Sequence, residues 1–507
     1  MASIQSSNTN GASVGYTYDD LNRLSTVVDN RLPGNNTTTY TYDPASNLAT
    51  VNYANGVQSV MTYDALNRIT GLATQNTGYV YQRGATGTLT SATELSGRTL
   101  NWTYDGIYRL TNETISSDPS NNNGTSSYSL DPVGNRLAES TTLPDMSSGS
   151  FGYNADDEVN TETYDANGNK LSTGGKTFAY DAENHLTSMN SGAVTIIYDG
   201  DGNRVSKTVG GVTTQYLVDD MTPTGYAQVV EELVGGAVAR QYTYGLQRIS
   251  ENQVISNVWT PSFYGYDGGG NVRSLTNTAG AITDEYEYDA YGNAFTKAGS
   301  TPNVYLYRGE QYDSDLGLYY LRARYYNPAT GRFMSLDPED GNPINPATLH
   351  KYIYAGSNPI KYVDPTGRDL FGYAIRSSAA IPEAKLISIY GCVADAALAA
   401  ADLILDPTIT ASSALGAGSA VIGCVLLTPG IGQLADQGTK IVKNTVRAIR
   451  LIGKASGWGS CALDAEDFVN GLNDLATGKP AGNEISKSIE NLGGCVGDLL
   501  GGMLKDE

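Results

Sequence analysis

The chain has 507 residues, which predicts roughly two to four domains, or a repeat array joined to a separate domain. Its net charge of -21 argues against a large nucleic-acid interface, because a phosphate backbone requires a basic protein surface, so we expect no nucleic acid as a general partner. The chain has 36 Tyr and 58 Gly but only 7 Phe and 3 Trp. This composition predicts a mainly β fold of short strands and turns.

The N-terminal stretch MASIQSSNTNGASVGYTYDD lacks the basic segment and following apolar segment of a Sec signal peptide. Three origins therefore remain open. The chain is cytosolic, it is exported by a route that needs no such signal, or it is cut from a longer polypeptide.

Variants of one short unit recur from the N-terminus to about residue 300. Where clear copies are adjacent they are roughly 20 to 25 residues apart, the range of stacked repeats that bury an apolar face only against a neighbour. The copies are GYTYDDLNRL at Gly15, TYTYDPASNL at Thr39, VMTYDALNRI at Val60, NWTYDGIYRL at Asn101, TFAYDAENHL at Thr177, IIYDGDGNRV at Ile196, FYGYDGGGNV at Phe263 and YEYDAYGNAF at Tyr286.

Each unit is predicted to form a β-hairpin. Tyr16 and Tyr18 alternate along a strand and fall on one face, Asp19 opens a turn, and Arg23 begins the return strand. In turns such as Asn-Gly-Asn at residues 167–169, the glycine supplies a positive φ. Tyrosines repeated at one register would stack between neighbouring hairpins as an aromatic ladder.

These units resemble YD repeats. The stretch YLYRGEQYDSDLGLYYLRARYYNPATGRFMSLDP from Tyr305, with YAGSNPIKYVDPTG from Tyr354, resembles the core domain associated with Rhs repeats. The resemblance covers residues 1 to about 368 and extends to the C component of Tc toxins. It implies a spiral of stacked β-hairpins that forms a shell or part of one. We expect a YD-repeat array at residues 1–300, a core domain that plugs the shell at 301–368, and a small α-helical effector domain at 369–507.

The same resemblance implies a function. The chain would be a fragment of an Rhs-type polymorphic toxin, secreted or on the cell surface, whose shell encapsulates and delivers the C-terminal effector in interbacterial competition. An immunity protein is an expected partner, as is an upstream shell portion or a partner chain, because the repeat region is short for a closed shell. The alternative is a non-enzymatic cell-surface YD-repeat protein for adhesion or carbohydrate binding, which exposed tyrosines would favour. No cofactor and no metal site are predicted.

In several members of this family the core domain cuts the chain after a final Asp-Pro-x-Gly-Leu motif by means of paired aspartates. The motif matches assign this role to Asp337 and Asp364. Two adjacent carboxylates divide the work, because one activates water while the other, its pKa raised by its neighbour, holds a proton. The cut would fall between Arg368 and Asp369, with Arg368 where the family has Leu. An arginine there could also bind both carboxylates and lower both pKa values. At most, the chain is a self-cleaving aspartyl protease.

Structural interpretations of the same residues also stand. Asp-Pro followed by Gly opens turns without any chemistry. Arg332 is either a hydrogen-bonding partner of Asp337 or part of a surface ion pair. His350 is expected to be solvated in a loop, and with His185, the only other histidine, it builds no Ser-His-Asp or Cys-His arrangement.

After Arg368 the apolar spacing predicts helices, and no motif of a turnover enzyme is present. Residues 407–435 contain no charged residue and form either a membrane-spanning segment or a Gly-packed helical hairpin. The next helix has a basic stripe that would lie on an anionic membrane, dock on an acidic partner, or face solvent. The stripe consists of Lys440, Lys443, Arg447, Arg450 and Lys454. The four cysteines are either buried thiols or two disulfides: Cys392, Cys424, Cys461 and Cys495.

Overall fold

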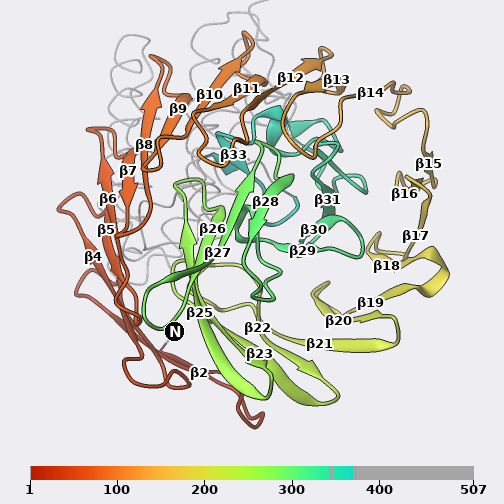
Figure 1. The fold of residues 1–507 in the computed structure, drawn as a ribbon. Helices are drawn as coiled ribbons and strands as arrows, with labels where there is room; N and C mark the ends of the chain where they lie inside the picture. Colours follow the sequence, from red (N-terminus) through yellow and green to blue (C-terminus); the bar gives the residue numbers. More distant parts are fainter. Residues whose placement is uncertain (1, 342–347, 369–370, 373–507) are drawn as a thin grey trace, which may run out of the picture. The chain divides into compact units, whose positions relative to one another are not determined.

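The computed structural model describes residues 2–341, 348–368 and 371–372 (Figure 1). The chain divides into two compact units, Met1–Glu383 and Ala384–Glu507, and all described residues belong to the first. The prediction of a mainly β fold is confirmed for them. Besides strands they contain short 3-10 turns, η1 (Asn190–Gly192), η2 (Tyr307–Gly309) and η4 (Ala355–Ser357). The predicted helical domain, with its basic stripe and cysteines, lies outside the described residues apart from residues 371–372.

The first sheet has 14 strands that follow one another in chain order, each antiparallel to the next. Its strands are β1 (Ser3–Gln5), β2 (Ser13–Tyr18), β3 (Leu24–Asp29), β4 (Thr37–Tyr42), β5 (Leu48–Asn52), β6 (Gln58–Tyr63), β7 (Ile69–Ala73), β8 (Gly78–Arg83), β9 (Leu89–Glu94), β10 (Thr99–Tyr104), β11 (Leu110–Ser116), β12 (Gly124–Leu130), β13 (Arg136–Thr141) and β14 (Gly149–Ser150).

The second sheet also has 14 strands in chain order. Its strands are β15 (Thr163–Tyr164), β16 (Lys170–Thr173), β17 (Lys176–Tyr180), β18 (Leu186–Met189), β19 (Val194–Tyr198), β20 (Arg204–Val209), β21 (Val212–Asp219), β22 (Gln228–Val234), β23 (Ala237–Tyr244), β24 (Arg248–Ile255), β25 (Val258–Tyr266), β26 (Val272–Thr276), β27 (Ile282–Tyr288) and β28 (Ala294–Ala298). The predicted stack of consecutive hairpins is therefore present in both sheets.

The segment after residue 300 forms two small sheets. The first contains β29 (Gln311–Asp313), β30 (Leu318–Leu321), β31 (Arg324–Asn327) and β32 (Arg332–Phe333), and the second contains β33 (Tyr362–Val363) and β34 (Phe371–Gly372). These short strands pack against the repeat region. The Tyr319 hydroxyl donates to the Gly292 carbonyl at 3.0 Å, and Tyr326 shares a buried aromatic cluster with Tyr288 of β27.

The Asp of each repeat builds the turn of its hairpin. In the first repeat, Asp19 Oδ1 accepts hydrogen bonds from the backbone N–H groups of Leu21 at 3.0 Å and Arg23 at 2.9 Å. Asn22 takes the left-handed conformation with φ of 57°, which asparagine tolerates better than most residues. The Oδ1 contact with the fourth following N–H recurs at Asp43, Asp64, Asp105, Asp131, Asp165, Asp181, Asp199, Asp267 and Asp289.

The tyrosine before this Asp joins one hairpin to the preceding one through its hydroxyl group. Tyr42 donates to the Leu24 carbonyl at 2.7 Å, and Tyr63 donates to the Leu48 carbonyl at 2.9 Å. The hairpins are thus linked by hydroxyl-to-backbone hydrogen bonds rather than by the predicted ring stacking. A β-bulge before Tyr18 also interrupts the predicted alternation, since Tyr16 is 6% exposed and Tyr18 is 39% exposed.

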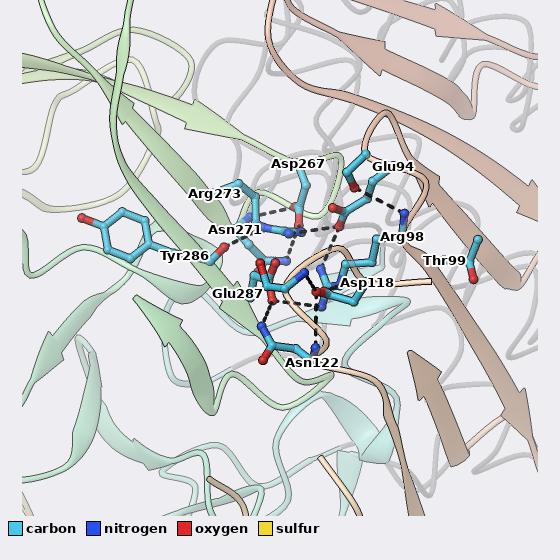
Figure 2. Close-up of polar contacts among 12 residues, drawn as sticks. Glu94, Arg98, Thr99, Asp118, Asn122, Asp267, Asn271, Arg273, Tyr286 and Glu287 are labelled. Atoms are coloured by element: carbon cyan, nitrogen blue, oxygen red, sulfur yellow. Dashed lines mark hydrogen bonds and ion pairs between the residues drawn. The ribbon is translucent and has the colours of Figure 1, made fainter. Parts of the chain in front are cut away.

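A buried charge network joins the two large sheets (Figure 2). Glu94 at the end of β9 accepts from Arg98 at 2.9 Å and from Arg273 of β26 at 3.0 Å. Arg98 is 1% exposed and also pairs with Asp118 at 2.9 Å. Asp267 lies 3.5 Å from Arg273. Breaking one such buried pair is costly, because the remaining charge loses its partner, so we interpret this network as a joint between the sheets.

Candidate functional site

Asp337 and Asp364 each open a turn, as the structural interpretation of the Asp-Pro pairs predicts. Asp337 follows β32, and its Oδ1 accepts a hydrogen bond from the Glu339 N–H at 3.0 Å. Asp364 follows β33, and its Oδ1 accepts a hydrogen bond from the Arg368 N–H at 3.0 Å. Local backbone contacts therefore hold both carboxylates, independently of their contacts with distant residues.

Arg324 of β31 brings these two carboxylates together. Its Nη2 atom lies 2.7 Å from Asp337 Oδ2 and 3.2 Å from Asp364 Oδ2. The rest of the guanidinium is also held, because Nη1 donates to the Lys351 carbonyl at 3.1 Å and Nε donates to the Gly367 carbonyl. Sequence reasoning missed Arg324, although it lies in the RARYY segment of the core resemblance.

Burial dominates the electrostatics of this triad. The side chains of Arg324 and Asp364 are 3% and 5% exposed, and that of Asp337 is 15% exposed. Burial raises the pKa of Asp337 above its ordinary value, although the Arg324 charge opposes the shift. Burial also lowers the pKa of Arg324, against the pull of both aspartates. The sequence predicted that one of the two aspartates has its pKa raised by the neighbouring carboxylate, but burial is the larger cause of the raised pKa of Asp337.

Gly367 and Arg368 carry the chain out of this site. Gly367 has φ of 70°, and a Cβ at this position would overlap the Leu321 carbonyl oxygen, so both the conformation and the space require glycine. One hypothesis placed the Arg368 guanidinium between the two carboxylates, but this guanidinium does not lie there. Its Nη1 atom lies 3.5 Å from Glu339 Oε1 near the surface, and Arg324 occupies the position between the aspartates. Asp369 lies outside the described residues.

Both predictions for Arg332 are corrected. Its side chain is buried rather than on the surface, and Nη1 donates to Asn135 Oδ1 at 2.6 Å. In the described part of the chain, the Arg332 side chain contacts Asn135 and groups near it, and not Asp337. His350 is also buried, contrary to expectation, with Nε2 at 2.8 Å from the same Asn135 oxygen. Its Nδ1 accepts the Tyr352 N–H at 3.1 Å, and burial lowers the pKa of His350 to about 4.

A cavity of about 110 Å³ borders Asp364 on the side of the second sheet. Its lining mixes polar and apolar groups and includes Arg248, Glu310, Tyr354 and Asp364. A cavity of this size with charged side chains in its wall has room for ordered water. Solvent can therefore reach the neighbourhood of a carboxylate that is otherwise buried.

Two further results concern the described residues only. The described residues include no helix that is long and apolar enough to cross a membrane. They also contain no group of three or more His, Cys, Asp or Glu side chains that could hold a metal ion.

No protein-family model matches the chain. It is 32% identical over 370 residues to the tRNA3(Ser)-specific nuclease WapA of Bacillus spizizenii, a match that covers 69% of this chain and 15% of that protein. It is 33% identical over 253 residues to the tRNA nuclease WapA of Bacillus subtilis, covering 47% of this chain and 11% of that protein. The chain thus spans at most about a seventh of the length of these two relatives.

Solved structures show the same fold at lower identity. The crystal structure of TcdB2-TccC3 matches with a TM-score of 0.58 and 20% identity, covering 71% of this chain and 21% of that one. The Photorhabdus luminescens Tc holotoxin pore matches with a TM-score of 0.56 and 18% identity, covering 73% and 22%. The described residues therefore have the antiparallel β architecture of these structures, and the similarities in sequence and fold are consistent with an Rhs-type protein.

Proposed function

We propose that this chain is part of an Rhs-type polymorphic toxin that delivers residues 369–507 as its effector and cuts itself between Arg368 and Asp369. The observation that carries the proposal is the meeting of Asp337 and Asp364 on one buried guanidinium, directly before the cut. The delivery role is supported by the likeness to the WapA nucleases and to Tc toxin structures.

The adhesion alternative receives less support from the structure. It requires tyrosines that face solvent and stack on a ligand, but the repeat tyrosines bind neighbouring hairpins through their hydroxyl groups. Tyr40 and Tyr288 are only 7% and 6% exposed, although Tyr18 is 39% exposed. The buried rings therefore offer little surface on which a carbohydrate could stack.

In the proposed reaction each aspartate has a distinct role. Asp364 accepts hydrogen bonds from Arg368, Thr366 and Arg324, and in the proposed reaction it is the base that takes a proton from water. The hydroxide then attacks the Arg368 carbonyl carbon. Asp337, whose pKa burial raises, supplies the proton that the departing Asp369 amine requires. Cleavage is expected to slow as the pH rises through the raised pKa of Asp337, because its protonated fraction falls.

Arg324 acts as the positioning residue. Its charge stabilises the ionised Asp364 in a poorly solvated site, and its bonds to the Lys351 and Gly367 carbonyls align both turns. The Gly367 carbonyl lies one residue before Arg368, so the same guanidinium also orients the chain next to the scissile bond.

The experiment is a pulse–chase of the full chain in cell-free translation, followed on a denaturing gel. Wild type is expected to release residues 369–507, and sequencing of the new N-terminus should begin at Asp369. Asp337→Asn and Asp364→Asn should remain intact. The matched control is Asp340→Asn, an exposed neighbour in the same turn, which should be cut like wild type. An intact wild-type chain would overturn the proposed self-cleavage.

For the released tail we propose an action on anionic membranes. Its support is the sequence pattern alone, namely the uncharged residues 407–435 and the basic stripe from Lys440 to Lys454. The released tail should leak dye from vesicles that contain anionic lipid, and neutralising the five basic residues should stop the leak. No leak at any protein concentration would remove this part of the proposal.

A further inference from the structure

Both aspartate turns contact Arg368, the residue before the proposed cut. Its N–H donates to Asp364 Oδ1 at 3.0 Å and to Thr366 Oγ1 at 3.3 Å. Its guanidinium extends to the other turn, where Nη1 lies 3.5 Å from Glu339 Oε1. The residue is therefore held by its backbone on one turn and by its side chain on the other.

Glu339 is positioned by the same turn that positions Asp337. The Glu339 N–H donates to Asp337 Oδ1 at 3.0 Å, and the Glu339 carbonyl accepts a hydrogen bond from Lys351 Nζ. The Asp337 N–H donates in turn to the Lys351 carbonyl at 2.9 Å. These contacts fix the backbone of Glu339 relative to Asp337, so an ion pair to Glu339 also locates Arg368 relative to Asp337.

We infer that Glu339 is a specificity-determining residue that selects arginine at the position before the cut, an inference that rests on the proposed function. A carboxylate placed opposite a guanidinium recognises its charge and its shape. The two side chains are 55% and 51% exposed, so the pair contributes little to folding stability. Its effect is on orientation, because a held side chain restricts the backbone of residue 368 and keeps the carbonyl near both aspartates.

The test is a double-mutant cycle on the full 507-residue chain, with cleavage rates from the same pulse–chase. Its members are wild type, Glu339→Gln, Arg368→Met and the double variant. Methionine keeps a long unbranched side chain and removes the charge. Each single change is expected to slow cleavage about threefold to fivefold, the rate equivalent of one exposed ion pair, and the double variant should be no slower than either single variant.

The cycle also separates recognition of Arg368 from an effect on the acid. The Glu339 charge raises the pKa of Asp337, so Glu339→Gln by itself can change the rate through that residue. If Glu339→Gln slows the Arg368→Met chain as much as it slows wild type, Glu339 acts through Asp337 and the inference is overturned.

Two other outcomes identify which proposal fails. Equal rates for wild type and Glu339→Gln overturn the recognition role and leave self-cleavage standing, because Asp337→Asn and Asp364→Asn test that reaction independently. A wild-type chain that stays intact overturns both.

Discussion

Replacing Arg324 with Met is expected to destabilise the core segment and to stop self-cleavage. The change removes the partner of Asp337 and Asp364 and the donors to the Lys351 and Gly367 carbonyls. Methionine still packs on the Phe333 ring, over which the guanidinium lies at 3.6 Å, so the loss is electrostatic more than steric.

The magnitude follows from the burial of the groups left behind. Asp364 is 5% exposed and would remain without the Arg324 charge. Removing one partner of a buried ion pair costs about 3–5 kcal/mol. A folded body of about 370 residues has an unfolding entropy of about 0.8 kcal/mol/K, so the melting temperature should fall by about 5 °C.

Thermal unfolding at pH 7, followed by circular dichroism, measures this shift, and the pulse–chase measures cleavage. The matched control is Arg68→Met, because the Arg68–Asp64 pair is partly exposed at 26% and 24% and should give a smaller shift. Adding Asp364→Asn to Arg324→Met should recover part of the loss, since it removes a buried charge that no longer faces the Arg324 guanidinium. If Arg324→Met melts like the control and is cut at the wild-type rate, the reasoning is refuted.

Three further changes probe the repeat region. Burial raises the pKa of Glu113 from 4.5 to about 7. The carboxyl therefore ionises at a lower pH in the unfolded chain than in the folded one, and the free energy of unfolding falls by roughly 3 kcal/mol as the pH rises from 4.5 to about 7. Glu113→Gln should therefore raise the melting temperature at pH 8 more than at pH 4. Asp105→Ala should cost about 1–2 kcal/mol by thermal unfolding, because two backbone N–H groups lose their acceptor, whereas Asp105→Asn should cost less. Gly168→Ala would place a Cβ 2.5 Å from Leu336, next to the site, and should slow cleavage more than Gly174→Ala, which meets nothing within 4 Å.

Each of these changes has an outcome that would contradict it. Glu183→Gln, whose side chain is 75% exposed, is the control for the pH experiment, and an equal gain there at pH 8 would contradict the burial argument. If Asp105→Asn costs as much as Asp105→Ala, the ion pair with Arg109 carries the stability instead of the turn. Equal cleavage rates in the two glycine variants would show that Leu336 moves aside.

The sequence alone predicted the parts of this protein that depend on short-range contacts. The Tyr-Asp unit predicted a hairpin because Asp19 and Arg23 contact each other within a single turn. The two Asp-Pro matches predicted turns that Asp337 and Asp364 do open, for the same local reason.

Only the tertiary structure determined which side chains meet. Arg324 and Asp364 are 40 residues apart, and no local spacing indicates that the same guanidinium also binds Asp337. Arg332 and His350 appeared to be surface residues, yet both are buried around Asn135, about 200 positions earlier in the chain. A sequence pattern reveals contacts that recur with the period of a strand or turn, whereas these pairings arise because the core segment packs against distant hairpins.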